Sequence, residues 1–257
     1  MDKSSIIGIL LAVAGIVAGL LIEGGSLGQI LQPTAAMIVF GGTLGAVMLQ
    51  YPLVVVLAAF RKVVQVFVGK RPDTGLATKQ IVDFANRARR SGIVSLDAEL
   101  AAIQDPFLKQ AIMLAVDGTE PSELRKIMEI QIENRAEEDE RIPGVFESAG
   151  GFSPTIGIIG AVLGLIQVMQ HLDKIEEVGR GIAVAFVATI YGVGAANLVL
   201  LPAAGKLRGR IREERIHREM MLEGVVSVVE GLNPRMIEIK LQSFLAPEKE
   251  RRLPPAA

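Results

Sequence analysis

The chain of 257 residues contains no cysteine and no tryptophan, and it has only two histidines. Without cysteine it forms neither a disulfide nor a thiolate metal site. No histidine or acidic cluster has the spacing of metal ligands, and the sequence carries no phosphate loop or nucleophile elbow. These absences argue against an enzyme and predict no cofactor. The net charge of −1 gives no sign of a nucleic-acid partner.

What the sequence has instead is four long apolar runs, with its charge confined to the segments between and after them. The runs cover residues 5–22, 34–50, 152–170 and 182–204. Helices of about 17–23 residues cross or nearly cross a hydrocarbon core of about 30 Å. A soluble helix of this length would carry a polar face. We therefore predict an all-α polytopic membrane protein with four transmembrane helices and a helical cytoplasmic domain.

Lysine and arginine are distributed unevenly among the connections. Residues 23–33 contain none and residues 171–181 contain two, whereas the block 61–147 and the segment after residue 204 are rich in both. Because cytoplasmic connections carry the excess of basic residues, both termini and the middle block are expected in the cytoplasm. The basic cluster at 206–212 either anchors this topology or binds anionic membrane lipids.

The middle block has its own helix signals. Asp105–Pro106 predicts a helix start and Asp117–Gly118 its end, and Pro121 starts a longer helix that we expect to end before Pro143–Gly144. We divide the chain into membrane helices one and two (1–59), a cytoplasmic helical domain (60–150), membrane helices three and four (151–204), and a cytoplasmic C-terminal helix and tail (205–257).

Helices three and four are rich in small residues and contain no ionisable group. Gly157, Gly160 and Gly164 leave one face of helix three nearly bare. Such a face predicts either close packing within the bundle or a seam for another chain or a ligand path. No Asp, Glu, Lys, Arg or His occurs in 152–170 or 182–204. If protons cross here, the titrating carboxylate must come from a partner.

A few polar or helix-breaking residues mark a candidate ion pathway. Pro154, in the expected first turn of helix three, would free a backbone carbonyl, and Thr155 stands beside it. Thr189 lies in the middle of helix four and Pro202 near its inner end. The threonine hydroxyls either bond to their own helices or line an ion-contacting spot. Glu147 would either exchange protons at the cytoplasmic mouth or be a solvated helix-end residue.

Two stretches carry a resemblance to a known family. The segment GFSPTIGIIGAVLGLI (151–166) resembles the third membrane helix of MotA-type flagellar stator proteins, and VGRGIAVAFVATIYG (178–192) resembles their fourth. Residues 116–119 and 230–247, the order of the apolar runs and the large loop between the second and third agree with this. The resemblance covers nearly the whole chain.

The resemblance implies an ion-conducting subunit in the bacterial inner membrane. Such proteins form a homopentameric ring around two MotB-like chains, whose single membrane span carries the ion-binding aspartate and whose periplasmic domain binds peptidoglycan. The ring pushes the rotor protein FliG. The small faces of helices three and four would then hold the MotB helices. Pro154 and Pro202 match the family's two functional prolines, and Thr189 matches its polar position in helix four.

The resemblance also bears on the coupling ion. Sodium-driven members place a hydroxyl seven residues after the proline of helix three, where this chain has Ala161. A dehydrated Na⁺ needs several oxygen ligands and a methyl group offers none, so H⁺ is the expected ion. Thr155 and Thr189 remain as oxygen donors that would serve Na⁺.

The family's rotor contact uses an arginine and, eight residues later, an acid. Arg89 and Asp97 have this spacing, with Arg90 and Glu99 as neighbours. Family members usually have glutamate at the acid position, so Asp97 is a departure and Glu99 is a candidate to share the role. The alternative is that these are ordinary surface charges.

Three other functions stay open at this point. TolQ/ExbB-like energy transducers share the seam of helices three and four but have three spans, which the four runs disfavour. A small-solute transporter would show repeat symmetry or a broken binding helix. A passive scaffold would conduct no ions.

Overall fold

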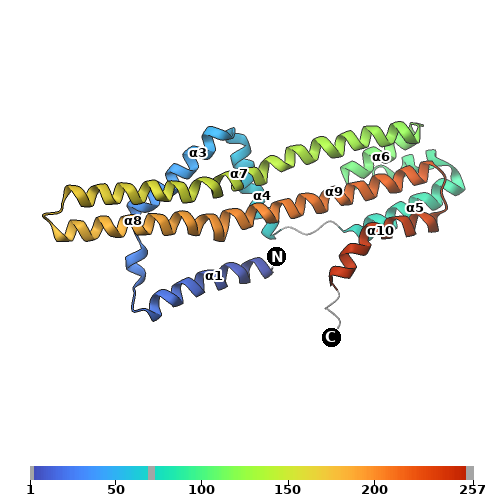
Figure 1. Ribbon diagram of the computed structural model, residues 1–257. Coiled ribbons are helices and arrows are strands. Elements are labelled where there is room, and N and C mark those ends of the chain that lie inside the picture. The colour runs from blue at the N-terminus through green and yellow to red at the C-terminus, as the bar shows by residue number, and fades with distance from the viewer. Residues whose placement is uncertain (1–2, 69–72, 253–257) are drawn as a thin grey trace. The chain divides into compact units, whose positions relative to one another are not determined.

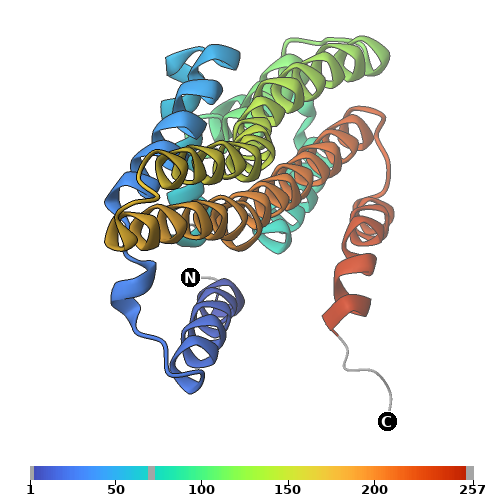
Figure 2. The same ribbon diagram turned by 60° about the vertical axis from the view of Figure 1, so that its left-hand side comes forward.

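The computed structural model describes residues 3–68 and 73–252, and all regular structure in these ranges is helical (Figure 1 and, in a turned view, Figure 2). The fourteen elements are α1 (Lys3–Ile22), the 3₁₀ helix η1 (Leu27–Ile30), α2 (Pro33–Ala36), the π-helix η2 (Met37–Gly41), α3 (Gly42–Gln50), α4 (Leu53–Val68), α5 (Thr74–Ser91), the 3₁₀ helix η3 (Ile93–Glu99), α6 (Pro106–Val116), α7 (Pro121–Gln170), α8 (Ile175–Ala195), the π-helix η4 (Ala196–Leu200), α9 (Leu201–Val229) and α10 (Pro234–Arg252). The predicted all-α class is confirmed.

The chain forms two compact units. The first comprises Met1–Lys70 and Asp139–Arg210, and the second comprises Arg71–Glu138 and Ile211–Ala257. We call the first the membrane unit, because it holds the four apolar runs, and the second the cytoplasmic unit. Helices α7 and α9 each begin in one unit and end in the other.

Three continuous helical segments of the described chain are long and apolar enough to cross a membrane. They are Leu27–Gln50, Pro121–Gln170 and Ile175–Val229. The first apolar run forms a shorter apolar helix over Ile6–Ile22. Several membrane-length helices are therefore present, and the last two extend far beyond the apolar runs that the sequence showed.

Helix α7 contradicts the expected break at Pro143–Gly144. It runs for 50 residues without interruption and contains both Pro143 and Pro154, so Pro154 lies well inside a helix rather than in a first turn. An interior proline costs about 3 kcal/mol because it removes one backbone hydrogen bond. Here the flanking turns are buried in one apolar cluster, which offsets that cost. This membrane-unit cluster comprises Val47, Val56, Ala59, Ile142, Val145, Phe146, Ala149, Ala203, Ala204 and Leu207.

The cytoplasmic unit packs around a separate core. Asp73 and Asp105 cap α5 and α6 by accepting hydrogen bonds from the backbone N–H groups of Leu76 and Leu108, at 3.0 and 2.9 Å. Gly118 has a φ of +82°, which suits glycine after a helix end. The start and end predicted for α6 are thus confirmed. The core is built from apolar side chains of α5, η3, α6, α7, α9 and α10, among them Ile81, Leu96, Ile112, Met128, Val225 and Leu241.

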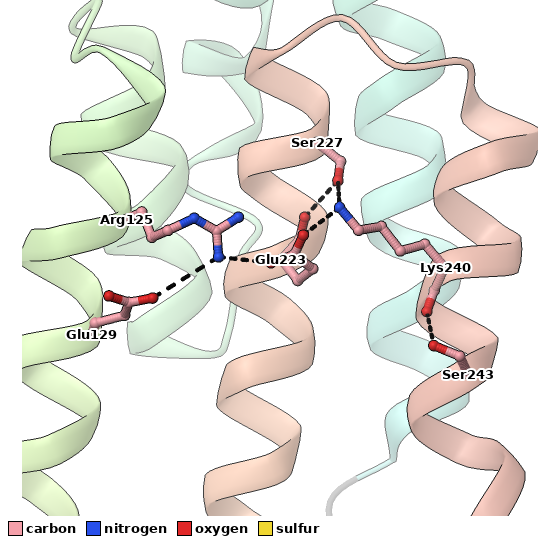
Figure 3. A network of polar contacts seen from close by, with 6 residues as sticks. All are labelled: Arg125, Glu129, Glu223, Ser227, Lys240 and Ser243. Carbon is pink, nitrogen blue, oxygen red and sulfur yellow. Dashed lines mark hydrogen bonds and ion pairs between the residues drawn. The ribbon is translucent and has the colours of Figure 1, made fainter.

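A polar network joins three helices of the cytoplasmic unit (Figure 3). Glu223 on α9 accepts a hydrogen bond from Arg125 on α7 at 2.8 Å and forms an ion pair with Lys240 on α10. Lys240 also donates to Ser227 at 3.2 Å. The hydrogen bond from Arg125 lowers the pKa of the Glu223 carboxyl below its ordinary value. The network fixes the C-terminal helix against the long helices.

His217 on α9 is buried, and its Nδ1 has no hydrogen-bond partner among the described residues. Burial lowers the pKa of His217 below its ordinary value of 6.5, although the nearby carboxylates of Asp105 and Asp73 act in the opposite direction. The unfolded chain therefore takes up a proton at a higher pH than the folded chain. Stability is full above about pH 6.5 and is lost as the pH falls below it.

The pH dependence gives a testable prediction. The melting temperature of the purified chain should fall when the pH is lowered from 7.5 to 5.5, and the substitution His217→Gln should reduce that fall. His171→Gln, which alters the other histidine, is the control and should leave the pH dependence in place. An equal fall in wild type and in His217→Gln would show that His217 is not the titrating group.

Candidate functional site

The glycines of the third apolar run lie against α8 of the same chain. A Cβ atom added to Gly164 would stand 2.7 Å from the carbonyl oxygen of Gly181, and one added to Gly157 would stand 2.8 Å from that of Ala188. At Gly160 the nearest atom would be the Cβ of Ala188, at 2.8 Å. These positions leave no room for a side chain, because backbone atoms of α8 occupy the space at Gly157 and Gly164 and the Ala188 side chain occupies it at Gly160.

The close approach of α7 and α8 decides between the two uses predicted for the small residues. The face of α7 that carries Gly157, Gly160 and Gly164 packs against α8 of the same chain, so it is not available to bind another chain. The expectation that the bare glycine faces hold partner helices is therefore wrong for these glycines. What α7 presents away from α8 is a set of exposed apolar side chains, among them Ile158, Ile159, Val162, Leu163 and Ile166.

Pro154 lies at the tightest part of this contact. A Cβ atom on Gly192 of α8 would stand 2.5 Å from the carbonyl oxygen of Ser153 and 3.2 Å from the Cα of Pro154. Ser153 itself is fully buried, and its hydroxyl has no hydrogen-bond partner within the described ranges. Pro154 has no N–H to bond the carbonyl of Gly150. The region therefore combines backbone contact between helices with unsatisfied polar groups.

The two threonines predicted to border the pathway bond to their own helices. The Thr155 hydroxyl donates to the Phe152 carbonyl at 2.8 Å, and the Thr189 hydroxyl donates to the Ala185 carbonyl at 3.3 Å. The self-bonding alternative is thus confirmed for both. Each oxygen still keeps lone pairs that can accept a proton donor or contact a cation. Thr155 is exposed and Thr189 half-buried.

Three of the predicted pathway residues fall on one face of α7. Glu147, Pro154 and Ala161 recur every seven residues, an interval that returns to nearly the same face of an α-helix with a drift of about 20°. Each is partly exposed. Thr189 of α8 lies opposite Gly157 of α7, and Gly157 is about one helical turn after Pro154. Glu147, Pro154 and Ala161 thus line one face of α7 over about 21 Å, and Thr189 of α8 lies near the middle of that stretch.

Pro202 is placed differently. It is exposed and lies at the start of α9, directly after the π-helix η4, in which the Leu201 N–H bonds to the Ala196 carbonyl. A widened turn followed by a proline leaves local backbone groups outside the regular helical pattern, and such π segments are frequent at functional sites. The side chain of Leu201 occupies the space beside Gly150 of α7. The sequence showed the proline but not the π-helix.

Glu147 is held by an arginine of α9. Arg208 donates from Nη2 to Oε2 of Glu147 at 2.7 Å and pairs through Nη1 with the other oxygen, so the contact is a two-pronged fork. Its Nε donates to Glu140 at 2.6 Å. Glu147 is therefore not the solvated helix-end residue of the second alternative. It lies inside α7, and Arg208 contacts both of its carboxylate oxygens.

These contacts also bear on the basic cluster at 206–212. Arg208 is committed to Glu140 and Glu147, and Lys206 and Arg210 likewise interact within the chain. Charges that are compensated internally attract anionic headgroups less strongly. For Arg208 the arrangement favours the topology-anchor alternative over lipid binding.

Tyr191 of α8 satisfies irregular backbone near the start of the second apolar run. Its hydroxyl donates to the Ile30 carbonyl at 2.6 Å and accepts from the Gln32 N–H at 3.3 Å. Its ring stacks on Phe40 with centroids 5.9 Å apart. Backbone groups outside a helix need such partners in apolar surroundings. The tyrosine thus fixes the connection between α1 and α2 to α8.

A cavity of about 680 Å³ lies within the membrane unit, between α1 and the packed helices. Its lining is almost wholly apolar and includes Val13, Phe40, Leu44, Phe146 and Leu198. The lining also includes three residues with hydroxyl groups, Thr43, Ser153 and Tyr191. Because Ser153 directly precedes Pro154, the cavity borders the region of the predicted pathway, although its mostly apolar lining offers few ligands for a cation.

The predicted rotor-contact residues lie in the cytoplasmic unit. Arg89 and Arg90 lie in the last turn of α5, and Asp97 lies in η3; all three are exposed. Within residues 3–68 and 73–252, neither the side chain of Arg89 nor that of Asp97 has a hydrogen bond or an ion pair. Glu99 instead pairs with Arg87. The structure thus leaves Arg89 and Asp97 available to a partner, and it assigns Glu99 an internal role that the sequence did not indicate.

Comparison with known proteins adds a second line of observation. Residues 99–220 match the MotA/TolQ/ExbB proton channel family, and residues 6–86 match the N-terminal domain of motility protein A. The chain is similar to motility protein A of Bacillus subtilis, with 36% identity over 98% of this chain and 93% of the relative. It is also similar to the chemotaxis protein PomA of Vibrio alginolyticus, with 29% identity over 95% and 96% of the two chains.

Two solved structures share the fold. A chain of the Campylobacter jejuni MotAB structure superposes with a TM-score of 0.89 and 32% identity, covering 95% of this chain and 96% of that chain. A chain of the flagellar MotAB stator complex from Bacillus subtilis gives a TM-score of 0.87 and 34% identity, covering 97% and 98%. Likeness of this extent covers both the membrane unit and the cytoplasmic unit.

Proposed function

Since this chain belongs to the motility protein A family, within the MotA/TolQ/ExbB proton channel family, we propose that it is the ion-conducting stator subunit of a bacterial flagellar motor. It acts in a complex with a MotB-like single-span protein, and both similar solved structures are of MotAB complexes. Ion flow through the complex turns the subunit ring and delivers torque to the rotor.

One observation carries the mechanism. The segments 152–170 and 182–204 contain the predicted pathway residues Pro154, Ala161 and Thr189. Neither segment has a residue that can gain or lose a proton near neutral pH. A proton in transit needs a titrating group, and an unpaired charge in the bilayer is costly. The carboxylate is therefore supplied by the partner's span, and this chain provides the walls, the hydroxyl oxygens and the helices that move.

The remaining assignments follow from this role. Five copies form the ring, both termini and the cytoplasmic unit lie in the cytoplasm of a bacterium, and the chain spans the inner membrane four times, with the short apolar helix Ile6–Ile22 as the first span. Arg89 and Asp97 meet the rotor protein FliG, with Arg90 beside them. Exposed charges of this kind act through steering and register more than through affinity.

The test of this function is a purification. The tagged chain, extracted from native membranes in mild detergent, should bring with it a single-span protein that has an aspartate near the start of its span. Recovery of homo-oligomers alone would contradict the proposed function and favour a transporter or a scaffold. A TolQ/ExbB-like role is less well supported, because residues 6–86 match the motility protein A N-terminal domain.

We further propose that the coupling ion is H⁺. Ala161, on the Pro154 face of α7, offers a methyl group where a dehydrated Na⁺ would need oxygen, and the oxygens of Thr155 and Thr189 are two ligands at most. Replacing Na⁺ by K⁺ at fixed pH should therefore leave the torque unchanged. Loss of rotation in the K⁺ medium, restored by Na⁺, would contradict proton coupling.

A further inference from the structure

The apolar cavity of the membrane unit is lined by two residues whose hydroxyl groups have no hydrogen-bond partner. The cavity measures about 680 Å³, and its lining includes Thr43 of α3 and Ser153 of α7. The two residues are 7% and 0% exposed, and neither hydroxyl bonds another group in the part of the chain that the structure describes. A buried hydroxyl without a partner is costly in apolar surroundings. The two hydroxyls therefore favour an occupant that accepts hydrogen bonds.

The two hydroxyls lie at a similar depth in the membrane unit. A Cβ atom added to Gly42 of α3 would stand 2.8 Å from the Cγ2 methyl group of Ile156 of α7. Thr43 directly follows Gly42, and Ser153 precedes Ile156 by three residues, which is about one turn. Ser153 is also the second residue of the apolar run 152–170, which starts at the cytoplasmic side in the proposed topology. The hydroxyls thus lie towards the inner boundary of the hydrocarbon core, beyond which the interfacial groups of the lipids begin.

The remainder of the lining is apolar and incompletely packed. Val13 of α1, Phe40 of η2 and Leu44 of α3 all line the cavity, and they are 49%, 53% and 46% exposed. The apolar faces of α1 and of the packed helices therefore leave the space between them unfilled. Such a space gains dispersion contacts from an apolar occupant and is a poor site for water. The occupant is accordingly apolar over most of its length, with a hydrogen-bond acceptor near one end.

The cavity has the length of one leaflet rather than of a whole membrane. Along α1 the lining extends from Ile9 to Val17, and along α8 and η4 it extends from Ile190 to Leu200. At about 1.5 Å per residue these stretches measure about 12 and 15 Å, and half of a hydrocarbon core of about 30 Å is about 15 Å. A membrane helix of a second copy would need a groove about twice as long, and 680 Å³ holds only about one to two turns of a helix about 10–12 Å across. A single acyl chain suits this space better than a helix.

We propose that the cavity binds one acyl chain of a phospholipid from the inner leaflet, and that the ester carbonyl oxygen of this chain accepts hydrogen bonds from Ser153 and Thr43. The proposal requires the chain to lie in a membrane, but it does not depend on the stator function. Because Ser153 directly precedes Pro154 and Leu200 of the π-helix η4 also lines the cavity, the bound chain would lie beside both elements. Segments of π-helix are frequent at functional sites.

The test is photolabelling with a phosphatidylethanolamine that carries a diazirine in one acyl chain. The lipid is added at increasing concentrations to the protein, which is purified in mild detergent with any partner that accompanies it. After irradiation, the labelled residues are identified by mass spectrometry of peptides. We expect saturable labelling of Val13 and Ile16, which line the cavity, and weak labelling that does not saturate around Gly15 on the opposite face of α1.

Two leucine substitutions form a matched pair. Gly194 lines the cavity, and a Cβ atom there would have no atom of the described chain within 4 Å, so Gly194→Leu fills the space without a clash. Gly15 is equally open, but it is outside the set of described residues that line the cavity. The saturable labelling should be lost in Gly194→Leu and retained in Gly15→Leu.

A third variant tests the hydroxyls and leaves the cavity open. The double substitution Ser153→Ala with Thr43→Val removes two groups that lack a protein partner, so it breaks no hydrogen bond among the described residues. Loss of two hydrogen bonds to the lipid should raise the half-saturating lipid concentration roughly tenfold or more. An unchanged half-saturating concentration would overturn the proposed role of the hydroxyls.

Two further results would overturn the proposal as a whole. One is saturable labelling of Val13 and Ile16 that persists in Gly194→Leu. The other is wild-type protein labelled only around Gly15, which would show that something other than lipid, such as a second copy of the chain, fills the space. Co-purification of a single-span partner is scored separately in the same preparation, so failure of the stator function and failure of the lipid site are distinguishable.

Discussion

Replacing Gly192 with alanine should abolish motility and sharply lower the amount of assembled protein. The new Cβ atom would stand 2.5 Å from the carbonyl oxygen of Ser153 and 3.2 Å from the Cα atoms of Gly157 and Pro154. All three are backbone atoms, so no side chain can rotate away and α7 must move from α8. Overpacking of this kind costs about 1–3 kcal/mol or more. Here it also displaces the turn that contains Pro154.

Gly194 provides a matched control on the same helix. A Cβ atom at Gly194 would have no atom within 4 Å, so Gly194→Ala adds the same methyl group without a clash. Membrane levels by immunoblot and swimming in soft agar measure both variants. Normal motility of Gly192→Ala, or equal loss in both variants, would show that the α7–α8 contact is not as tight as described.

Charge reversal at Arg89 should stop rotation while leaving the protein in the membrane. The Arg89 side chain is exposed at the end of α5 and has no partner among the described residues, so Arg89→Glu breaks no internal bond. The new carboxylate would turn an attractive site for the rotor into a repulsive one, and juxtaposed like charges cost several kcal/mol at an interface. Swimming in soft agar should be lost, with membrane levels and co-purification of the MotB-like partner unchanged.

The control for Arg89 is Lys126→Glu. Lys126 lies in the same unit, is 71% exposed and forms only a weak pair with Glu123 at 3.6 Å. Its reversal changes the net charge by the same amount and should leave swimming intact. The rotor assignment fails if Arg89→Glu cells swim normally, or if Lys126→Glu cells lose motility to the same degree.

Local sequence signals predicted much of this fold because their causes are local. The caps at Asp105 and Gly118 depend on neighbouring residues alone, and both were found where expected. Pro143 failed as a helix end because burial of Ile142, Val145 and Phe146 outweighs the lost hydrogen bond. That burial depends on α3, α4 and α9, which no local rule can include.

In the candidate site, too, local features could be predicted from the sequence and tertiary contacts could not. The glycine spacing in helix three predicted a close approach, but the identity of the opposing helix is tertiary information, so two alternatives stayed open. Arg208 is separated in sequence by 61 positions from Glu147 and by 68 positions from Glu140, the two residues that it contacts. The hydroxyl of Tyr191 donates to the carbonyl of Ile30, which is 161 positions away. The sequence did not indicate Ser153, because a serine beside a proline is common. What distinguishes Ser153 is that its hydroxyl is buried without a hydrogen-bond partner among the described residues, which only the structure shows.

We expect this chain to conduct protons only when a partner supplies the titrating carboxylate. The direct measurement is proton uptake by vesicles reconstituted with the purified complex under an imposed membrane potential. Uptake should occur with the native partner and disappear when the aspartate of the partner's span is replaced by asparagine. Equal uptake in both preparations, or uptake by this chain alone, would contradict it.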